Sequence, residues 1–345
     1  MPRAEITGWG KYVPTKILTN DDLAKMVDTS DEWITARTGI KERHIRTEND
    51  TTTGMACAAA RDALAVAGLT PSDLDLIVVA NSSPDYLLPA SANLVQYELG
   101  ANCPALTVTA GCSGWVYALV TASQFIQTGA YKNIVVIGVE LISYAIDYTD
   151  RSTCVLFGDA AAAVILQPGL TEAGIMAFEL GSDGQHAHHL MVPGGGTRKP
   201  MSQEVVDKRE MYIRMNGQEV FKFATRKLIT CLNNIAASAG MSPADFDLII
   251  PHQANLRIIE YAADKLHLSM DKFFINLHKY GNTSTASIPL ALVEAIQEGR
   301  LKSGDVTGMV AFGSGLSWAG AVIKMGEAVN KIAANTEPQG AVVLQ

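Results

Sequence analysis

The chain has 345 residues, of which 48% are apolar and 18% are charged, and its formal net charge is −8. This length is enough to bury a large core and suggests two domains. The negative charge argues against bulk binding of nucleic acid or of an anionic membrane, so an anionic partner would need a local basic patch.

Short apolar strands alternate with helices of small residues along most of the chain. The expected strands are 75–80, 105–109, 133–139, 162–166, 247–250 and 307–312, and the expected helices are 51–67, 91–99, 113–129, 217–239, 254–266 and 284–299. Alternation of this kind predicts parallel βαβ units with right-handed crossovers. The segments 113–129 and 286–296 are apolar or small nearly all round, so we expect both helices to be buried between layers.

The chain also contains a repeat. Residues 68–77 read GLTPSDLDLI and residues 240–249 read GMSPADFDLI, while IQTGAYK at 126–132 returns as IQEGRLK at 296–302. A duplicated fold with two central helices predicts a sheet on either side of them and further helices outside, a layered αβαβα arrangement. The expected units are an N-terminal half at 1–172, a C-terminal half at 173–330 and a mobile tail at 331–345.

No segment predicts a membrane span, a secretory signal or a metal centre. The apolar runs fall well short of the roughly 20 residues that a membrane helix needs, and the opening MPRAEITGWG has no apolar signal core. Five scattered cysteines without a CxxC motif argue against disulfides and zinc, so we expect a cytoplasmic protein. The polar loop 181–216 is predicted to be a functional surface excursion. Its histidines lack a cysteine or carboxylate in helical register, and we expect no metal at His186, His188 and His189.

Cys112 is the strongest candidate for a nucleophile. It lies in TAGCSGW directly before the first central helix, where backbone N–H groups and the helix dipole favour the thiolate. Its small neighbours leave room for a substrate. The alternative is a buried structural cysteine, which is our interpretation of Cys57, Cys103, Cys154 and Cys231.

The repeat places two further polar residues at matching ends of elements. The offset of the second repeat sets Asn282 against Cys112, and the offset of the first leads from Ala80 to His252. Polar residues after parallel strands are typical of α/β ligand sites, although His252 could also be a strand-end residue and Asn282 a helix cap. The glycine-rich FGSGLSW at 312–318 suits an oxyanion hole made of main-chain N–H groups.

Together these segments resemble the β-ketoacyl-acyl carrier protein synthase III family of the thiolase superfamily. The resemblance covers roughly residues 5–326. It is carried by TSDEWITARTGIKERHI (29–45), AGCSGW (110–115), DRSTCVLFGDAAAA (150–163), NGQEVFKFA (216–224), HQANLRI (252–258), GNTSTASIPLAL (281–292) and FGSGLSWAG (312–320). It implies a thiolase-like fold and a homodimer, because large apolar sheets leave an edge that needs covering.

The resemblance implies a catalytic triad of Cys112, His252 and Asn282. An acyl group passes from coenzyme A to Cys112. Malonyl-acyl carrier protein then loses CO₂, and its carbanion attacks the thioester to give a 3-oxoacyl-acyl carrier protein, which initiates type II fatty-acid synthesis. Backbone N–H groups of Cys112 and Ser314 are expected to meet the thioester oxyanion, and His252 and Asn282 the enolate. This chemistry implies no metal or redox cofactor.

The resemblance also implies substrate contacts. Those to coenzyme A carry over to Thr29, Trp33, Arg37, Arg151, Gly217, Phe221, Ala254 and Asn255. Trp33 and Arg151 would hold the adenine between them by stacking and cation–π contact. A basic patch for the acidic carrier protein would consist of Lys222, Arg226, Lys227 and Arg257, with a solvated helix face as the alternative for the first three.

One position bears on the acyl chain. In the resembled family, the residue before the proline of the loop at 84–90 often closes the acyl pocket of the partner subunit and can be a bulky aromatic. Here it is Leu88, in DYLLPAS. We therefore expect room for branched or medium acyl chains as well as for acetyl.

Other functions on the same fold remain open from the sequence. A starter-type synthase of specialised metabolism would pass the acyl group to another carbon, oxygen or nitrogen nucleophile. A degradative thiolase would need a second catalytic cysteine, which FGSGLSW lacks. HMG-CoA synthase would need an N-terminal catalytic glutamate; the segment 51–56 has none, which leaves Glu140 as a candidate. A non-catalytic subunit would usually lose the nucleophile.

Overall fold

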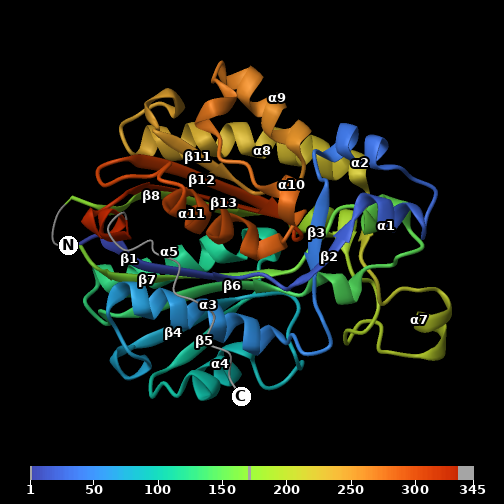
Figure 1. Ribbon diagram of the computed structural model, residues 1–345, viewed down its shortest axis with the longest axis horizontal. Helices are drawn as coiled ribbons and strands as arrows, with labels where there is room; N and C mark the ends of the chain where they lie inside the picture. Colours follow the sequence, from blue (N-terminus) through green and yellow to red (C-terminus); the bar gives the residue numbers. More distant parts are fainter. Residues whose placement is uncertain (1, 170–171, 333–345) are drawn as a thin grey trace.

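The computed structural model describes residues 2–169 and 172–332, so nearly all of the expected tail at 331–345 lies outside the described residues. Two β-sheets are stacked, with helices between them and on both outer faces (Figure 1). The αβαβα layering expected from the repeat is therefore confirmed. The proposed division at 172 falls between the last strand of the first sheet and the first strand of the second.

The first sheet has five strands in the order β1-β7-β6-β4-β5. Its strands are β1 (Ala4–Tyr12), β4 (Leu76–Ala80), β5 (Ala105–Val108), β6 (Ile134–Glu140) and β7 (Ala160–Pro168). Helices α3 (Thr52–Ala67) and α4 (Ser91–Leu99) cover its outer face (Figure 1). Strands β4 and β6 are buried along their whole length because both faces are covered, which explains why their sequences are apolar except for Glu140 at the end of β6.

The second sheet has four strands in the order β11-β12-β13-β8. Its strands are β8 (Gly174–Ser182), β11 (Leu248–Pro251), β12 (Val306–Gly313) and β13 (Ser317–Lys324). Helices α8 (Gly217–Ser238) and α9 (Leu256–Leu266) lie over the face turned away from the first sheet (Figure 1). Both helices bury an apolar face and expose a charged one, as expected for an outer layer.

The two predicted central helices are α5 (Gly114–Gln127) and α11 (Ser287–Gln297), and they lie between the sheets. One continuous core joins them to the inner faces of both sheets. The one charged residue inside α11, Glu294, is only 5% exposed. Its carboxylate is neutralised by Lys11 at 2.7 Å and also accepts hydrogen bonds from Tyr280 and Asn276.

The prediction of parallel βαβ units holds for only part of each sheet. Strand β4 is parallel to β5 and β6, and β11 is parallel to β12, but β1–β7, β6–β7, β12–β13 and β13–β8 are antiparallel. The connection between β12 and β13 covers only residues 314–316, which is too short for a parallel crossover. The expected strands and helices occur within a few residues of their predicted bounds, but β1, β8 and β13 were not predicted.

The remaining elements are short and lie mostly at one side of the layers (Figure 1). They are α1 (Asn20–Ala24), α2 (Asp31–Thr38), α6 (Arg151–Cys154), α7 (Gln203–Asp207), α10 (Leu277–Tyr280), β2 (Lys16–Thr19), β3 (Glu42–Ile45), β9 (Leu190–Met191) and β10 (Arg214–Met215). The predicted excursion at 181–216 thus contains α7 and a two-stranded ribbon. Within it His186 pairs with Asp183 at 2.8 Å. The described part of the chain contains no cluster of three or more side chains suited to hold a metal ion.

Candidate active site

Cys112 lies in a 3-10 turn, Gly111–Ser113, immediately before α5. Its side chain is only 8% exposed. Two glycines allow the end of β12 to approach it. Gly111 has a φ of +53°, and a Cβ on Gly313 would lie 2.7 Å from the Cys112 nitrogen and 2.8 Å from its Cβ. Larger residues at these two positions would push the segments apart.

The sulfur of Cys112 accepts hydrogen bonds from the backbone N–H groups of Cys112 and Ser314, both of which lower the pKa of the thiol. Burial has the larger effect, and it raises that pKa to about 11. The sequence-based expectation that the helix end favours the thiolate is therefore outweighed by desolvation, because the helix dipole is a weaker effect than complete burial of a charge. The cysteine at rest is a thiol.

His252 follows β11 directly and is 2% exposed. Its Nδ1 lies 2.6 Å from the Ser287 hydroxyl, at the start of α11, and its ring meets Phe312 edge-on at 5.3 Å. Burial lowers the pKa of the imidazole to about 3, so the ring is neutral at physiological pH. A Ser287 hydroxyl that donates to Nδ1 leaves the ring proton on Nε2, which makes Nε2 a neutral donor.

Asn282 is 7% exposed, and both its backbone N–H and its backbone carbonyl form hydrogen bonds. Its N–H donates to the Leu156 carbonyl at 2.8 Å, and its carbonyl accepts from Gly158 at 3.0 Å. The side-chain Oδ1 accepts the Ser284 N–H at 2.9 Å, which leaves the Nδ2 amide free to donate elsewhere. Asn282 thus caps a local turn and also presents an oriented donor.

The structure brings these three side chains to one cavity of about 90 Å³. The predicted coenzyme A contacts Gly217, Phe221, Ala254 and Asn255 line the same cavity. A second cavity of about 220 Å³ reaches Cys112 from another side, and its walls include Ile142, Ala145, Leu190, Val192, Ile213, Ser284 and Ser314. Cys112 therefore lies where a channel bordered by α8 meets a mainly apolar pocket.

The other predicted coenzyme A contacts lie further out. The Arg151 guanidinium lies 4.9 Å and that of Arg37 5.7 Å from the centre of the Trp33 ring. Asn255 links this group to the cavity, because its amide donates to the Arg37 carbonyl at 3.1 Å. The Thr29 hydroxyl is buried and has no hydrogen-bond partner within the described residues.

The predicted basic patch is only partly free. Lys222 pairs with Glu219 at 2.8 Å, and the Lys227 ammonium lies 3.2 Å from the centre of the Trp318 ring. Arg226 and Arg257 are exposed and form no ion pair with the part of the chain that the structure describes. Arg226 and Arg257 are therefore the members of the predicted patch that remain available to an acidic partner.

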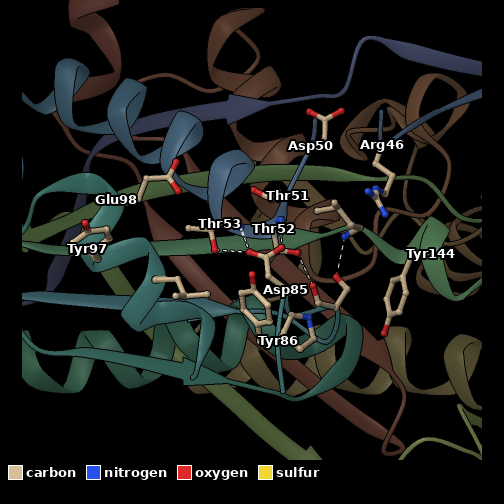
Figure 2. Close-up of a pocket in the computed structure, with 14 residues that line it drawn as sticks. Arg46, Asp50, Thr51, Thr52, Thr53, Asp85, Tyr86, Tyr97, Glu98 and Tyr144 are labelled. Carbon is tan, nitrogen blue, oxygen red and sulfur yellow. Dashed lines mark hydrogen bonds between the residues drawn. The ribbon is translucent and has the colours of Figure 1, made fainter. Parts of the chain in front are cut away.

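Leu88 is 86% exposed and does not line either cavity at Cys112. Its loop is anchored by Asp85, which accepts hydrogen bonds from the backbone of Thr52 and Thr53 at the start of α3 (Figure 2). A separate hollow of about 600 Å³ borders this loop, with Tyr86 and Tyr144 among its lining residues (Figure 2). In this single chain, Leu88 points to no acyl pocket.

Two further polar residues lie beside Cys112: Ser284, which was not assigned to the site from the sequence, and Glu140, which was considered only as the catalytic glutamate of an HMG-CoA synthase. The Ser284 hydroxyl lies 3.4 Å from the Cys112 sulfur and 3.3 Å from a carboxylate oxygen of Glu140. A signal for both existed. Ser284 stands two residues after Asn282, and Glu140 is a charged residue that ends the otherwise apolar strand β6, at the carboxyl edge where α/β sites form.

A duplicated, layered α/β fold, with a cysteine at the start of one central helix and a neutral histidine and an oriented amide beside it, defines a thiolase-like acyltransferase. The models of the 3-oxoacyl-[acyl-carrier-protein] synthase III family match residues 106–184 and, for its C-terminal part, 236–325. The chain belongs to this family and is a condensing acyltransferase.

Individual relatives support the same assignment. The β-ketoacyl-[acyl-carrier-protein] synthase III of Caldanaerobacter subterraneus is 50% identical over 322 residues, which span 93% of this chain and 97% of the relative. That of Symbiobacterium thermophilum is 49% identical, spanning 93% and 98%. The crystal structure of the Aquifex aeolicus 3-oxoacyl-[acyl-carrier-protein] synthase III matches with a TM-score of 0.87 at 46% identity, covering 93% of this chain and 99% of that one. No helix among residues 2–169 and 172–332 is long and apolar enough to span a membrane.

Proposed function

We propose that this enzyme transfers an acyl group from coenzyme A to Cys112 and then condenses it with malonyl-acyl carrier protein, in the cytoplasm, to start type II fatty-acid synthesis. The observation that carries the proposal is the position of Cys112. Its sulfur lies at the meeting point of two cavities and faces the backbone N–H groups of Cys112 and Ser314.

The first half-reaction forms a thioester on Cys112. The sulfur attacks the acyl-CoA carbonyl, and the resulting oxyanion needs two donors close to the sulfur. The N–H groups of Cys112 and Ser314 already point at this region, and each such donor is typically worth about 3 kcal/mol of transition-state stabilisation. The acyl chain occupies the apolar cavity of about 220 Å³, and the pantetheine arm occupies the narrower one.

The second half-reaction needs neutral donors for an enolate. When the malonyl group loses CO₂, negative charge develops on its thioester oxygen. The Nε2–H of neutral His252 and the Nδ2 amide of Asn282 supply two such donors without the cost of burying a second charge. The carbanion then attacks the Cys112 thioester and releases the 3-oxoacyl product. Thioester exchange and decarboxylation of this kind require no metal or redox cofactor.

The residues around the channel suit binding of both coenzyme A and the acyl carrier protein. We assign the adenine end of coenzyme A to Trp33 and Arg151, and the pantetheine arm to the wall that contains Gly217, Phe221, Ala254 and Asn255. The acidic carrier protein docks on Arg257 and Arg226, with Lys222 available once its weak, exposed pair with Glu219 is exchanged.

We propose that the active form is a homodimer built on the exposed edge of the first sheet. Strand β5 pairs with β4 on one side only. Nearby apolar side chains are unusually exposed, with Leu87 and Leu88 at 86% and Tyr97 at 84%. A second copy would cover this edge and bring Leu88 to the partner's acyl pocket. Sedimentation analysis should give a dimer that Leu87→Asp dissociates; a monomeric wild-type enzyme with full activity would contradict the proposal.

Two measurements test the proposed function. Intact-mass analysis after incubation with acetyl-, isobutyryl- or octanoyl-CoA should show one acyl group per chain, absent in Cys112→Ser. Addition of malonyl-acyl carrier protein should then give 3-oxoacyl-acyl carrier protein from all three donors. Absence of labelling would refute the acyl-enzyme, a strict preference for acetyl would refute the open pocket, and transfer to another nucleophile alone would favour a starter-type enzyme.

A further inference from the structure

The proposed acylation leaves one proton without an acceptor. Cys112 is a buried thiol, so its proton must leave before or during attack on the acyl-CoA. His252 is a poor base because burial lowers the pKa of its imidazole to about 3. The amide of Asn282 accepts no proton at neutral pH. The three proposed catalytic side chains therefore do not explain how the nucleophile is activated.

A buried carboxylate lies one hydroxyl group away from the sulfur. Glu140 ends β6, and its side chain is fully buried. One oxygen accepts the Ser82 N–H at 3.0 Å and the Ser284 hydroxyl at 3.3 Å, and the other accepts the Ser83 hydroxyl at 2.5 Å. Since Ser284 Oγ also lies 3.4 Å from the Cys112 sulfur, a continuous hydrogen-bonded line runs from thiol to carboxylate.

The surroundings of Glu140 hold no compensating cation. Within the described residues no lysine or arginine pairs with it, and its neighbour across the β6–β7 ladder is Ala160. The titratable groups that face it are Cys112 and Tyr144. Burial without a cation raises the pKa of Glu140 to about 7, and its charge in turn raises the pKa of Cys112. Two anions are therefore disfavoured here, and the first negative charge of the pair forms on Glu140.

Ser284 is held in place for this contact. Its φ is +50°, in the left-handed region that non-glycine residues seldom adopt. The Asn282 side chain accepts its backbone N–H at 2.9 Å and so maintains this conformation. The same turn thus orients the Asn282 amide and directs the Ser284 hydroxyl between sulfur and carboxylate. Strained backbone that is kept by specific contacts is common at functional sites.

We propose that Glu140 receives the thiol proton of Cys112 through the Ser284 hydroxyl and keeps it until the thiolate is released. Ser284 touches the reacting sulfur, whereas Glu140 acts through Ser284 and is a positioning residue for the proton. The proposal rests on the proposed acylation of Cys112, because it concerns the same sulfur. It does not depend on which acyl group is transferred.

The steps balance over one turnover. During acylation the S–H bond of Cys112 breaks as the S–C bond forms, Ser284 takes the thiol proton and passes its own to Glu140, and coenzyme A leaves as a thiolate that is protonated by water. During condensation the malonyl carboxylate leaves as CO₂, the new C–C bond forms, and the S–C bond breaks to release the Cys112 thiolate. Glu140 returns its proton through Ser284, so each cycle takes up one proton from solvent.

The test measures how fast iodoacetamide alkylates Cys112 between pH 5.5 and 9.5, using intact-mass analysis and no acyl-CoA. In the wild type the rate should rise with an inflection near pH 7, where Glu140 becomes ionised. Glu140→Gln and Ser284→Ala should lose this inflection and react about 100-fold more slowly at pH 7.5, the usual range for a lost general base. Single-turnover acylation by acetyl-CoA should show the same pattern.

Asp159→Asn is the matched control. Asp159 is a second buried carboxylate with a raised pKa, and it accepts the Ser143 hydroxyl at 2.5 Å, but no hydrogen-bonded line leads from it to Cys112. This variant should keep the inflection. Equal slowing in Asp159→Asn would overturn the relay in favour of general loosening of the sheet.

A purely electrostatic role for Glu140 predicts the opposite sign. Removal of a nearby negative charge would lower the pKa of Cys112, so faster alkylation in Glu140→Gln would overturn the proposal. If Glu140→Gln does not fold, as judged by its melting curve, the loss or retention of the inflection in Ser284→Ala decides whether the relay exists. If the wild-type enzyme shows the inflection but is not labelled by acyl-CoA, the proposed function is refuted and the relay stands. If it is labelled but shows no inflection, the relay is refuted and the proposed function stands.

Discussion

His252→Ala should separate the two halves of the reaction. The imidazole is 2% exposed and neutral, and we assign its Nε2–H to the enolate of the malonyl group. One buried donor of this kind is typically worth about 3 kcal/mol, and about 1.4 kcal/mol corresponds to a tenfold change in rate. Decarboxylation should therefore slow by about 100-fold, while acylation of Cys112 should proceed at close to the wild-type rate.

The assay follows each half-reaction by itself. Acylation is measured as the mass increase of the chain after mixing with acyl-CoA, and decarboxylation as CO₂ release from malonyl-acyl carrier protein added to the pre-acylated enzyme. Ser287→Ala is the control, because it keeps the imidazole but removes the hydroxyl 2.6 Å from Nδ1, and it should cause a smaller loss in decarboxylation alone. Equal slowing of both steps in His252→Ala would refute the role assigned to the imidazole.

Three further changes test other parts of the site and the fold. Gly313→Ala would place a Cβ 2.7 Å from the Cys112 nitrogen and push β12 away from it, so acylation measured by intact mass should fall at least tenfold and the melting temperature should also fall; unchanged acylation would mean that this approach is unimportant. Trp33→Ala should raise the KM for acyl-CoA about fivefold or more, without a matching change in kcat, because it removes a stacking surface; a loss in kcat alone would argue against adenine binding there. Asp147 pairs with Arg209 at 2.6 Å, which holds the pKa of its carboxyl well below the unfolded value of 3.8. This pair stabilises the fold above about pH 4 and loses its effect as pH falls, so Asp147→Asn should reduce the free energy of unfolding by about 2 kcal/mol at pH 7 and by much less at pH 2.5; an equal loss at both values would contradict the ion pair.

Much of the fold could be predicted because the apolar segments are long and regular. β4, β6 and β12 are buried on both faces along nearly their whole length, so their sequences consist almost entirely of apolar and small residues. The antiparallel strands β1, β8 and β13 were missed because they mix polar, small and glycine residues with apolar ones, which weakens any periodic signal. The direction of β13 is set by the short 314–316 connection, which a pattern of apolar runs does not reveal.

The active site, like the fold, could be predicted from the sequence only in part. Cys112, His252 and Asn282 could be selected as candidates because the repeat sets them at equivalent ends of elements, before the two central helices and after a buried strand. Local sequence also predicted a reactive thiolate at the start of α5. The backbone N–H groups do lower the pKa of the thiol, but burial outweighs them and raises that pKa to about 11.

The linear order of residues thus specified which segments form strands and helices, that the fold is duplicated, and which side chains stand at the ends of its elements, because these features depend on local propensity and spacing. Only the packing of the two halves decided that Cys112, Ser284 and Glu140 form one hydrogen-bonded line, and that His252 stays neutral. Protonation states and contacts of this kind depend on desolvation and on neighbours far away in the chain, so they arise only when the sheets and central helices have assembled.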